Sequence, residues 1–156
     1  MTPAVHLVKK RQIDFVLHEY HHDSGTLSYG LEAAEKLAVD PACVFKTLVV
    51  SDEKAKLAVA VLPVGNTLNL KKMAKALSVK KVAMADPKVV ERNTGYVLGG
   101  VSPLGQKRLL PTVIDASAQC QKTIYVSAGR RGLEIELSAK VLAQVLGATF
   151  ADIVSG

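Results

Sequence analysis

A glycine-rich segment from Asn93 to Lys107 is the feature that most restricts how this chain can fold. It reads NTGYVLGGVSPLGQK and holds four glycines, at positions 95, 99, 100 and 105, with a Ser-Pro step between them. Glycine adopts backbone angles closed to other residues and leaves its amide N–H uncovered, so such a loop can approach a ligand closely and offer donors to an oxygen. We therefore predict an irregular binding surface here and not a packed element.

The composition is that of a folded protein. With 49% apolar and 22% charged residues over 156 positions, we expect residues 1–156 to form one domain with a single core. Aromatic residues make up 4% and tryptophan is absent, so this core must rest on aliphatic side chains. No apolar run approaches the ~18 residues of a membrane span and no signal-peptide core is visible, so we expect a cytoplasmic protein without a membrane partner.

The positive charge is concentrated in the second part of the chain. Residues 1–60 carry seven Lys/Arg and eight Asp/Glu, whereas residues 61–156 carry thirteen and six. This distribution fits attraction of a polyanion such as RNA, and an ordinary solvated basic surface is the alternative. The basic residues near expected element ends are Lys71, Lys72, Lys75, Lys80, Lys81, Lys107, Arg108, Arg130 and Arg131.

The hydrophobic pattern predicts short helices and strands in no regular alternation. Capping residues, prolines and glycines predict helices at 3–11, 31–39, 69–77, 87–93 and 138–146. Strands are expected at 13–20, 44–50, 56–62, 80–84, 112–115, 123–127 and 133–137, with a short tail strand or cap at 149–154. This order favours an α+β fold, with a mixed, partly barrel-like β-sheet of about seven strands flanked by four or five helices.

Common catalytic and cofactor patterns fit poorly. His18, His21 and His22 have no thiol or carboxylate partner in a known ligand spacing, and Cys43 and Cys120 are isolated, so we predict no metal site and no disulfide. There is no GxSxG elbow for a serine nucleophile. The glycines match neither GxGxxG nor GxxxxGK[ST], so we expect no nucleotide cofactor.

Lys46 is unusual because it lies at the start of an otherwise apolar strand, FKTLVV. One reading is an edge-strand lysine that protects against aggregation. The other is a cation directed into a cleft at phosphate or hydroxyl oxygens.

Six segments together carry a family resemblance. They are VFKTLVV at 44–50, LAVAVLPV at 57–64, LNLKKMAKAL at 68–77, MADP at 84–87, TGYVLGGVSPLGQK at 94–107 and IYVSAGRRGLEIEL at 124–137. In their order and spacing the chain resembles the YbaK/EbsC family of free-standing aminoacyl-tRNA deacylases, relatives of the editing domain of bacterial prolyl-tRNA synthetases. It is most similar to the branch that hydrolyses Cys-tRNA(Pro). The resemblance covers almost the whole chain and implies the YbaK editing-domain fold.

The resemblance also implies a set of site residues. Lys46 would hold ribose or phosphate oxygens of the terminal adenosine and orient the ester. The GGxSP loop would hold the carbonyl oxygen as negative charge develops, with Gly100 and Val101 as catalytic residues and Gly99 and Ser102 as substrate-binding ones. The remaining substrate-binding residues by similarity are Tyr20, Ser127, Gly129 and Glu136.

The implied activity is trans-editing, with mischarged tRNA(Pro) and prolyl-tRNA synthetase as partners. In the Cys-specific branch the substrate's own thiol attacks its carbonyl and releases a thiolactone. Two alternatives stay open: water attack on Ala-tRNA(Pro) or another small ester, and a non-catalytic module that binds tRNA or the synthetase. Residues 21–26 form one of the family's variable regions at the pocket border, so they bear on which aminoacyl group is preferred.

Overall fold

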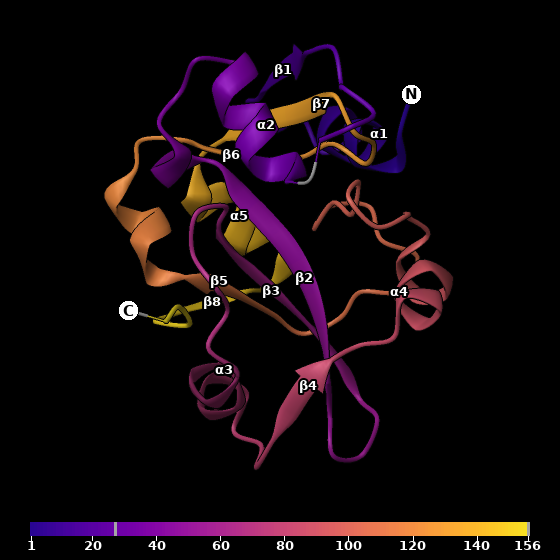
Figure 1. The fold of residues 1–156 in the computed structure, drawn as a ribbon, viewed down its shortest axis with the longest axis vertical. Helices are drawn as coiled ribbons and strands as arrows, with labels where there is room; N and C mark the ends of the chain where they lie inside the picture. The colour runs from indigo at the N-terminus through magenta and orange to yellow at the C-terminus, as the bar shows by residue number, and fades with distance from the viewer. Residues whose placement is uncertain (27, 156) are drawn as a thin grey trace.

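The computed structural model describes residues 1–26 and 28–155, whose strands form two open sheets. No helix in the described residues is long and apolar enough to cross a membrane. Figure 1 shows the smaller sheet above the larger one, with α5 behind β2 and with α3 and α4 towards the outside. The elements are α1 (Pro3–Lys10), β1 (Val16–Glu19), α2 (Tyr29–Lys36), η1 (Pro41–Cys43), β2 (Phe45–Asp52), β3 (Leu57–Pro63), α3 (Leu70–Leu77), β4 (Val82–Met84), α4 (Pro87–Thr94), β5 (Thr112–Asp115), η2 (Ala116–Cys120), β6 (Ile124–Ser127), β7 (Leu133–Leu137), α5 (Ala139–Leu146) and β8 (Thr149–Ala151).

Local capping explains where the helices begin and end. Thr2 accepts a hydrogen bond from Val5 N at 3.2 Å at the start of α1, and Asn69 accepts one from Lys72 N at 3.0 Å at the start of α3. Both caps were predicted, and the helices they start are confirmed. Helix α2 begins earlier than expected because Ser28, and not a residue near position 31, provides its cap.

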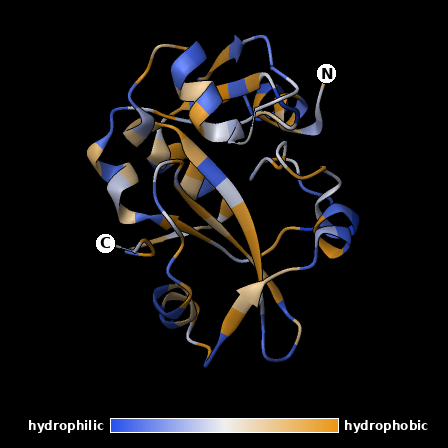
Figure 2. Cartoon of the chain, in the orientation of Figure 1, coloured by the Kyte–Doolittle hydropathy of each residue, from blue (hydrophilic) through white to orange (hydrophobic). Residues whose placement is uncertain are grey.

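The larger sheet has the order β4-β2-β3-β5-β8 and is covered on both faces. β2 and β3 form the predicted antiparallel hairpin, in which Lys46 pairs with Leu62. Side chains along β3 alternate: Val59 and Val61 belong to the main core, whereas Leu62 packs with Met73 of α3. Figure 2 shows the hydrophobic residues concentrated along these strands.

The smaller sheet has the order β1-β7-β6 and meets the larger one through a single bridge between Val44 and Tyr125. Helix α2 packs near this junction, where Ala33 and Ala34 contact Val44 and Tyr125. The α+β class and the mixed sheet are confirmed. The strands do not close into a barrel, because this bridge is the only described pairing between the two sheets.

The glycine-rich segment is more deeply packed than its composition predicted. Val101, Ser102 and Leu104 are buried, and the Tyr96 hydroxyl donates to Leu104 O at 2.6 Å. A Cβ on Gly105 would lie 2.6 Å from the carbonyl carbon of Pro3, so this glycine lets the loop touch the start of α1. The prediction that the segment does not pack is therefore wrong for its centre, and its exposed residues are Gly95, Val97 and Leu98 before that centre and Lys107 at its end.

The connection into α2 is tied down by the buried carboxylate of Glu32. It accepts hydrogen bonds from His22 Nδ1 at 2.7 Å, Asp23 N at 2.8 Å and Thr26 Oγ1 at 2.8 Å. Burial by itself raises the pKa of Glu32, but these hydrogen bonds outweigh it and lower the pKa to about 2. The variable segment is thereby fixed against the helix that borders the site.

We predict that Glu32→Gln lowers the free energy of unfolding at pH 7 by about 2–3 kcal/mol, because the amide cannot accept all of these hydrogen bonds. Since the folded-state pKa of Glu32 is depressed, its stabilisation is present above about pH 4.5 and is lost as pH falls towards 2. Denaturant unfolding at pH 7 and pH 3 measures both effects. Glu35→Gln, on the exposed side of the same helix, is the matched control and should change little. Equal losses in the two variants would contradict this account.

Candidate active site

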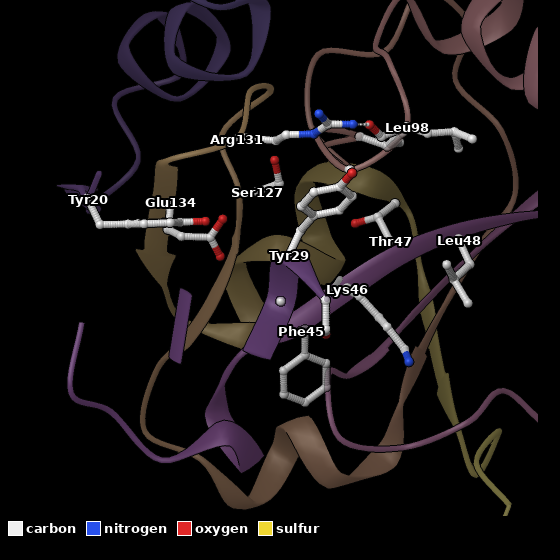
Figure 3. Close-up of a pocket in the computed structure, with 14 residues that line it drawn as sticks. Tyr20, Tyr29, Phe45, Lys46, Thr47, Leu48, Leu98, Ser127, Arg131 and Glu134 are labelled. Atoms are coloured by element: carbon white, nitrogen blue, oxygen red, sulfur yellow. Dashed lines mark hydrogen bonds between the residues drawn. The ribbon is translucent and has the colours of Figure 1, made fainter. Parts of the chain in front are cut away.

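A cavity of about 220 Å³ lies where the two sheets, the start of α2 and the tip of the glycine-rich segment meet. Figure 3 shows the side chains that line it. Sequence reasoning named five of the lining residues, which are Tyr20, Lys46, Gly99, Val101 and Ser127. The others are Ser28, Tyr29, Gly30, Phe45, Thr47, Leu48, Leu98, Arg131 and Glu134.

Lys46 reaches the cavity from β2. Its Nζ donates to Val64 O at 3.5 Å and forms no ion pair with any described residue. Burial lowers the pKa of this lysine below its ordinary value. At Lys46, β2 is paired on one side alone, with β3, because β4 pairs only with residues 50–52. An ammonium without an anionic partner, in a cavity, is available to an incoming anion.

Thr47 follows Lys46 in β2 and was not predicted. Its Oγ1 has almost no accessible surface, and it is the one such side-chain oxygen or nitrogen in residues 1–26 and 28–155 that lacks a hydrogen-bond partner. An unpaired buried hydroxyl costs roughly 1–3 kcal/mol, so a ligand that pairs with it recovers that cost. The residue type alone gave no signal, because threonine is common in strands.

Glu134 of β7 is a second cavity residue that was not predicted from the sequence. Its side chain lines the cavity, is 7% exposed as a residue, and makes no hydrogen bond or ion pair with the described residues. Burial raises the pKa of Glu134 to about 8. Figure 3 shows Glu134 and Lys46 on opposite sides of the cavity, so the two unpaired groups do not neutralise each other.

Glu136, the acid that was predicted, does not line the cavity. Its carboxylate accepts from Thr123 Oγ1 at 2.6 Å and lies 2.9 Å from His18 Nε2. The hydrogen bonds from Thr123 and His18 lower the pKa of Glu136. The segment LEIEL places both acids on one face of β7, so their spacing links Glu134 to Glu136 but does not show which of them lines the cavity.

Tyr20 lies beside Glu134 at one end of the cavity (Figure 3). Burial, and then the charge of Glu134, raise the pKa of Tyr20 to about 12, so the phenol keeps its proton. Its backbone N donates to Gly132 O at 3.0 Å, which fixes the segment against the β6–β7 turn.

The tip of the glycine-rich segment forms a turn in which Gly100 N donates to Val97 O at 3.0 Å and Gly99 has a φ of +85°. The Gly100 amide is thus already used within the turn. The amides of Gly99 and Val101 donate to no other described residue. They are the backbone donors that this turn leaves for a ligand.

Ser102 and Gly129 support the cavity without lining it. Ser102 Oγ accepts from Leu104 N at 3.1 Å inside the buried loop. Gly129 has a φ of +107° and donates to Ser127 Oγ at 3.1 Å, and a Cβ there would lie 2.6 Å from the Tyr96 ring. Both residues therefore shape the turns around the cavity.

Arg131 and Tyr29 form the rim. Arg131 was named only as one of the basic residues and Tyr29 was not named. Arg131 Cζ lies 4.1 Å from the centroid of the Tyr29 ring, and an Nη of the same arginine donates to Leu98 O at 2.7 Å. Figure 3 shows this contact joining the β6–β7 turn to the glycine-rich tip. A GRRG turn was visible in the sequence, but nothing in it indicated which arginine turns inward.

The histidines considered as metal ligands have other partners. His18 pairs with Glu136, and His22 pairs with Glu32. Within the described residues no group of three or more His, Cys, Asp or Glu side chains is arranged to hold a metal ion.

Residues 27–145 match the family model described as the aminoacyl-tRNA editing domain. This chain belongs to that family. The family activity is removal of the aminoacyl group from tRNA, so the protein is an ester hydrolase of the deacylase class.

Relatives of this editing domain agree with the assignment. Over 152 residues it is 38% identical to EbsC of Enterococcus faecalis, named as a candidate Cys-tRNA(Pro)/Cys-tRNA(Cys) deacylase, and the match covers 97% of this chain and 92% of EbsC. A crystal structure of a hypothetical protein superposes with a TM-score of 0.87 at 28% identity, covering 98% of this chain and 99% of that one. A structure described as a candidate trans-editing enzyme for prolyl-tRNA synthetase shares the fold, with a TM-score of 0.83, 24% identity, and coverage of 98% and 93%.

The raised pKa of Glu134 gives a prediction for the stability of the editing domain. A carboxyl group with a folded-state pKa of about 8 binds its proton more tightly when folded, so the free energy of unfolding falls as pH rises from about 4.5 to 8. Glu134→Gln should remove this decline, leaving the variant more stable than the wild type at pH 8.5 by about 2–5 kcal/mol. Urea unfolding of both proteins between pH 5 and 8.5 tests this. Parallel pH profiles would show that Glu134 is not desolvated.

Proposed function

We propose that this editing domain deacylates mischarged tRNA(Pro) in trans, with Cys-tRNA(Pro) as its main substrate. The observation that carries the proposal is the pair of unpartnered ionisable groups, the Lys46 ammonium and the Glu134 carboxyl, on two sides of one small cavity. An aminoacyl ester at the end of tRNA is itself bipolar, because it has an α-ammonium at one end and phosphate oxygens at the other. The 38% identity to EbsC supports the cysteinyl substrate.

In this proposal each charged group takes one end of the substrate. Glu134 accepts hydrogen bonds from the α-ammonium, which supplies the cation that its carboxylate lacks. Lys46 binds ribose or phosphate oxygens of the terminal adenosine and so orients the ester. A cavity of about 220 Å³ is about seven water volumes at ~30 Å³ each, which suits a small aminoacyl group.

The ester carbonyl would lie against the glycine-rich turn. The amides of Gly99 and Val101 are the available donors for the oxygen as it gains negative charge. Gly100 acts by closing the turn, and its missing side chain keeps the turn close to Arg130, whose Cα would lie 3.0 Å from a Cβ at this position. Thr47 Oγ1 is a further donor or acceptor for the bound substrate.

For a cysteinyl ester the reacting group comes from the substrate. The thiol sulfur forms a bond to the carbonyl carbon, the bond from that carbon to the ribose oxygen breaks, and the thiol proton ends on the ribose oxygen. The products are a thiolactone and free tRNA. Holding the reacting atoms together in the cavity makes this intramolecular step fast, and none of the lining residues needs to act as a nucleophile.

The biological need follows from limits on binding selectivity. A synthetase pocket for proline is small and nearly apolar, and such a pocket rejects a residue of similar size by only ~1–3 kcal/mol. A second site that hydrolyses the wrong ester supplies the rest. We therefore propose prolyl-tRNA synthetase as the partner that delivers the charged tRNA, and the cytoplasm as the location.

We predict a clear order of rates with tRNA(Pro) charged in turn with Cys, Ser, Ala and Pro. Cysteine should be released at least about tenfold faster than serine, which has the same shape but a hydroxyl that is a poor nucleophile at neutral pH, and prolyl-tRNA should persist. Acid-quenched time courses with radiolabelled amino acids measure the rates, and mass spectrometry detects the thiolactone. If serine and cysteine are released equally fast, thiol assistance is refuted. If alanine is released fastest, the enzyme edits Ala-tRNA(Pro) by water attack.

We predict that Lys46→Ala lowers kcat/KM for Cys-tRNA(Pro) by at least about 100-fold, because the ester loses the group that orients it. Circular dichroism should stay unchanged, since an alanine fits in β2. Lys54→Ala, in the turn of the same hairpin, removes an exposed lysine and should keep wild-type activity. If Lys46→Ala releases cysteine as fast as the wild type, Lys46 does not orient the ester. Tight tRNA binding without hydrolysis by the wild type would indicate a non-catalytic module.

A further inference from the structure

A second concave surface lies between α3 and β4, away from the active site. It is lined by Leu70, Lys71, Ala74, Lys80, Lys81 and Val82. Its floor is apolar and all its charged residues are lysines. Figure 1 shows α3 and β4 at the end of the molecule opposite the small sheet, and Figure 2 shows hydrophilic stretches on α3 and in the turn before β4.

The three lysines of this basic groove have unpaired ammonium groups. Lys71, Lys80 and Lys81 are exposed and form no ion pair with a described residue. By contrast, Lys72 on the same helix is 2.9 Å from Asp152 and is neutralised locally. One acid contacts the groove: Glu53 Oε2 accepts a hydrogen bond from the backbone N of Lys81 at 3.4 Å, and it does not pair with the lysine ammonium.

The groove and the active site are joined by one continuous strand. Asp52 follows Lys46 by six residues along β2, or about 20 Å, and Asp52 pairs with Val82 in the groove floor. A chain that enters the active site by its end and continues along this face would pass the groove within a few nucleotides. Two cationic sites on one rigid strand can therefore contact one polyanion.

We propose that this basic groove binds backbone phosphates of the RNA whose acylated end occupies the active site. The inference rests on the proposed function for its substrate. RNA is favoured over a protein partner because lysine is depleted in protein interfaces, where arginine and aromatic residues are enriched, and this groove has neither. Lysine ammonium groups act as point charges that suit phosphates and carry no sequence preference, so the groove supplies affinity and position.

The test uses the full chain with Lys71→Glu, Lys80→Glu and Lys81→Glu combined. The matched control combines Lys88→Glu, Lys122→Glu and Lys140→Glu, which changes net charge equally at exposed lysines outside the groove. Fluorescence anisotropy with uncharged tRNA(Pro) between 50 and 200 mM salt measures binding without any hydrolysis. We expect the groove variant to bind at least about tenfold more weakly than the control, with a log–log salt slope shallower by about 2.

Hydrolysis provides the second measurement. For Cys-tRNA(Pro) the groove variant should lose at least about tenfold in kcat/KM relative to the control, whereas both should cleave a cysteinyl ester of a CCA trinucleotide at the same rate. Equal tRNA affinity in the two variants would contradict the proposal that the groove binds RNA. So would a loss of synthetase binding with tRNA affinity intact, since that would make the surface a protein interface. If the groove variant loses tRNA binding but the wild type hydrolyses neither ester, the RNA-binding role of the groove is supported and the proposed deacylase activity is refuted.

Discussion

The architecture of the active site depends on the close approach of two turns that have almost no side chains between them. A Cβ on Gly99 would lie 2.6 Å from both Arg131 Nε and the Tyr29 ring, and one on Gly100 would lie 3.0 Å from the Cα of Arg130. Either substituent would push the glycine-rich tip away from the β6–β7 turn. Gly99 and Val101, whose amides donate to no other described residue, line the cavity beside this contact. The buried centre of the loop, held by Tyr96 and Leu104, is the rigid support that this contact needs.

The cavity also contains polar and ionisable groups that have no partner within the protein. Lys46 and Glu134 are both desolvated, and neither has a partner of opposite charge among the described residues. Thr47 adds a buried hydroxyl without a hydrogen bond. Elsewhere the fold satisfies its buried acids, as the hydrogen bonds to Glu32 and Asp115 show. All three groups line the same cavity, and such clustering of perturbed groups is typical of functional sites.

Local structure was largely predictable because its causes are local. The caps at Thr2 and Asn69, the hairpin of β2 and β3, and the glycine at the end of α4 are set by residues within a few positions of each other. The site was predictable only in part. Lys46 was predictable because a cation interrupts the apolar pattern of its strand. Glu134 was not, because acids that alternate along a strand have the same spacing on an exposed face as on a cavity wall. The resemblance to known deacylases pointed to Glu136, and only its hydrogen bonds to Thr123 and His18 show that it is occupied.

By itself the sequence determined the class of the fold, the positions of the helices and strands, the family, and the lysine and glycine segments that bear on function. These depend on periodicity, capping and motif spacing, which are properties of the chain read in order. The tertiary structure decided which side chains share a cavity: that β7 turns Glu134 and not Glu136 into it, that Arg131 and Tyr29 form its rim, and that Gly100 spends its amide on Val97. Apart from the local bond between Gly100 and Val97, these contacts join residues far apart in the sequence, such as Arg131 with Leu98 and with Tyr29. Burial and pairing across such separations are set only when the sheets pack.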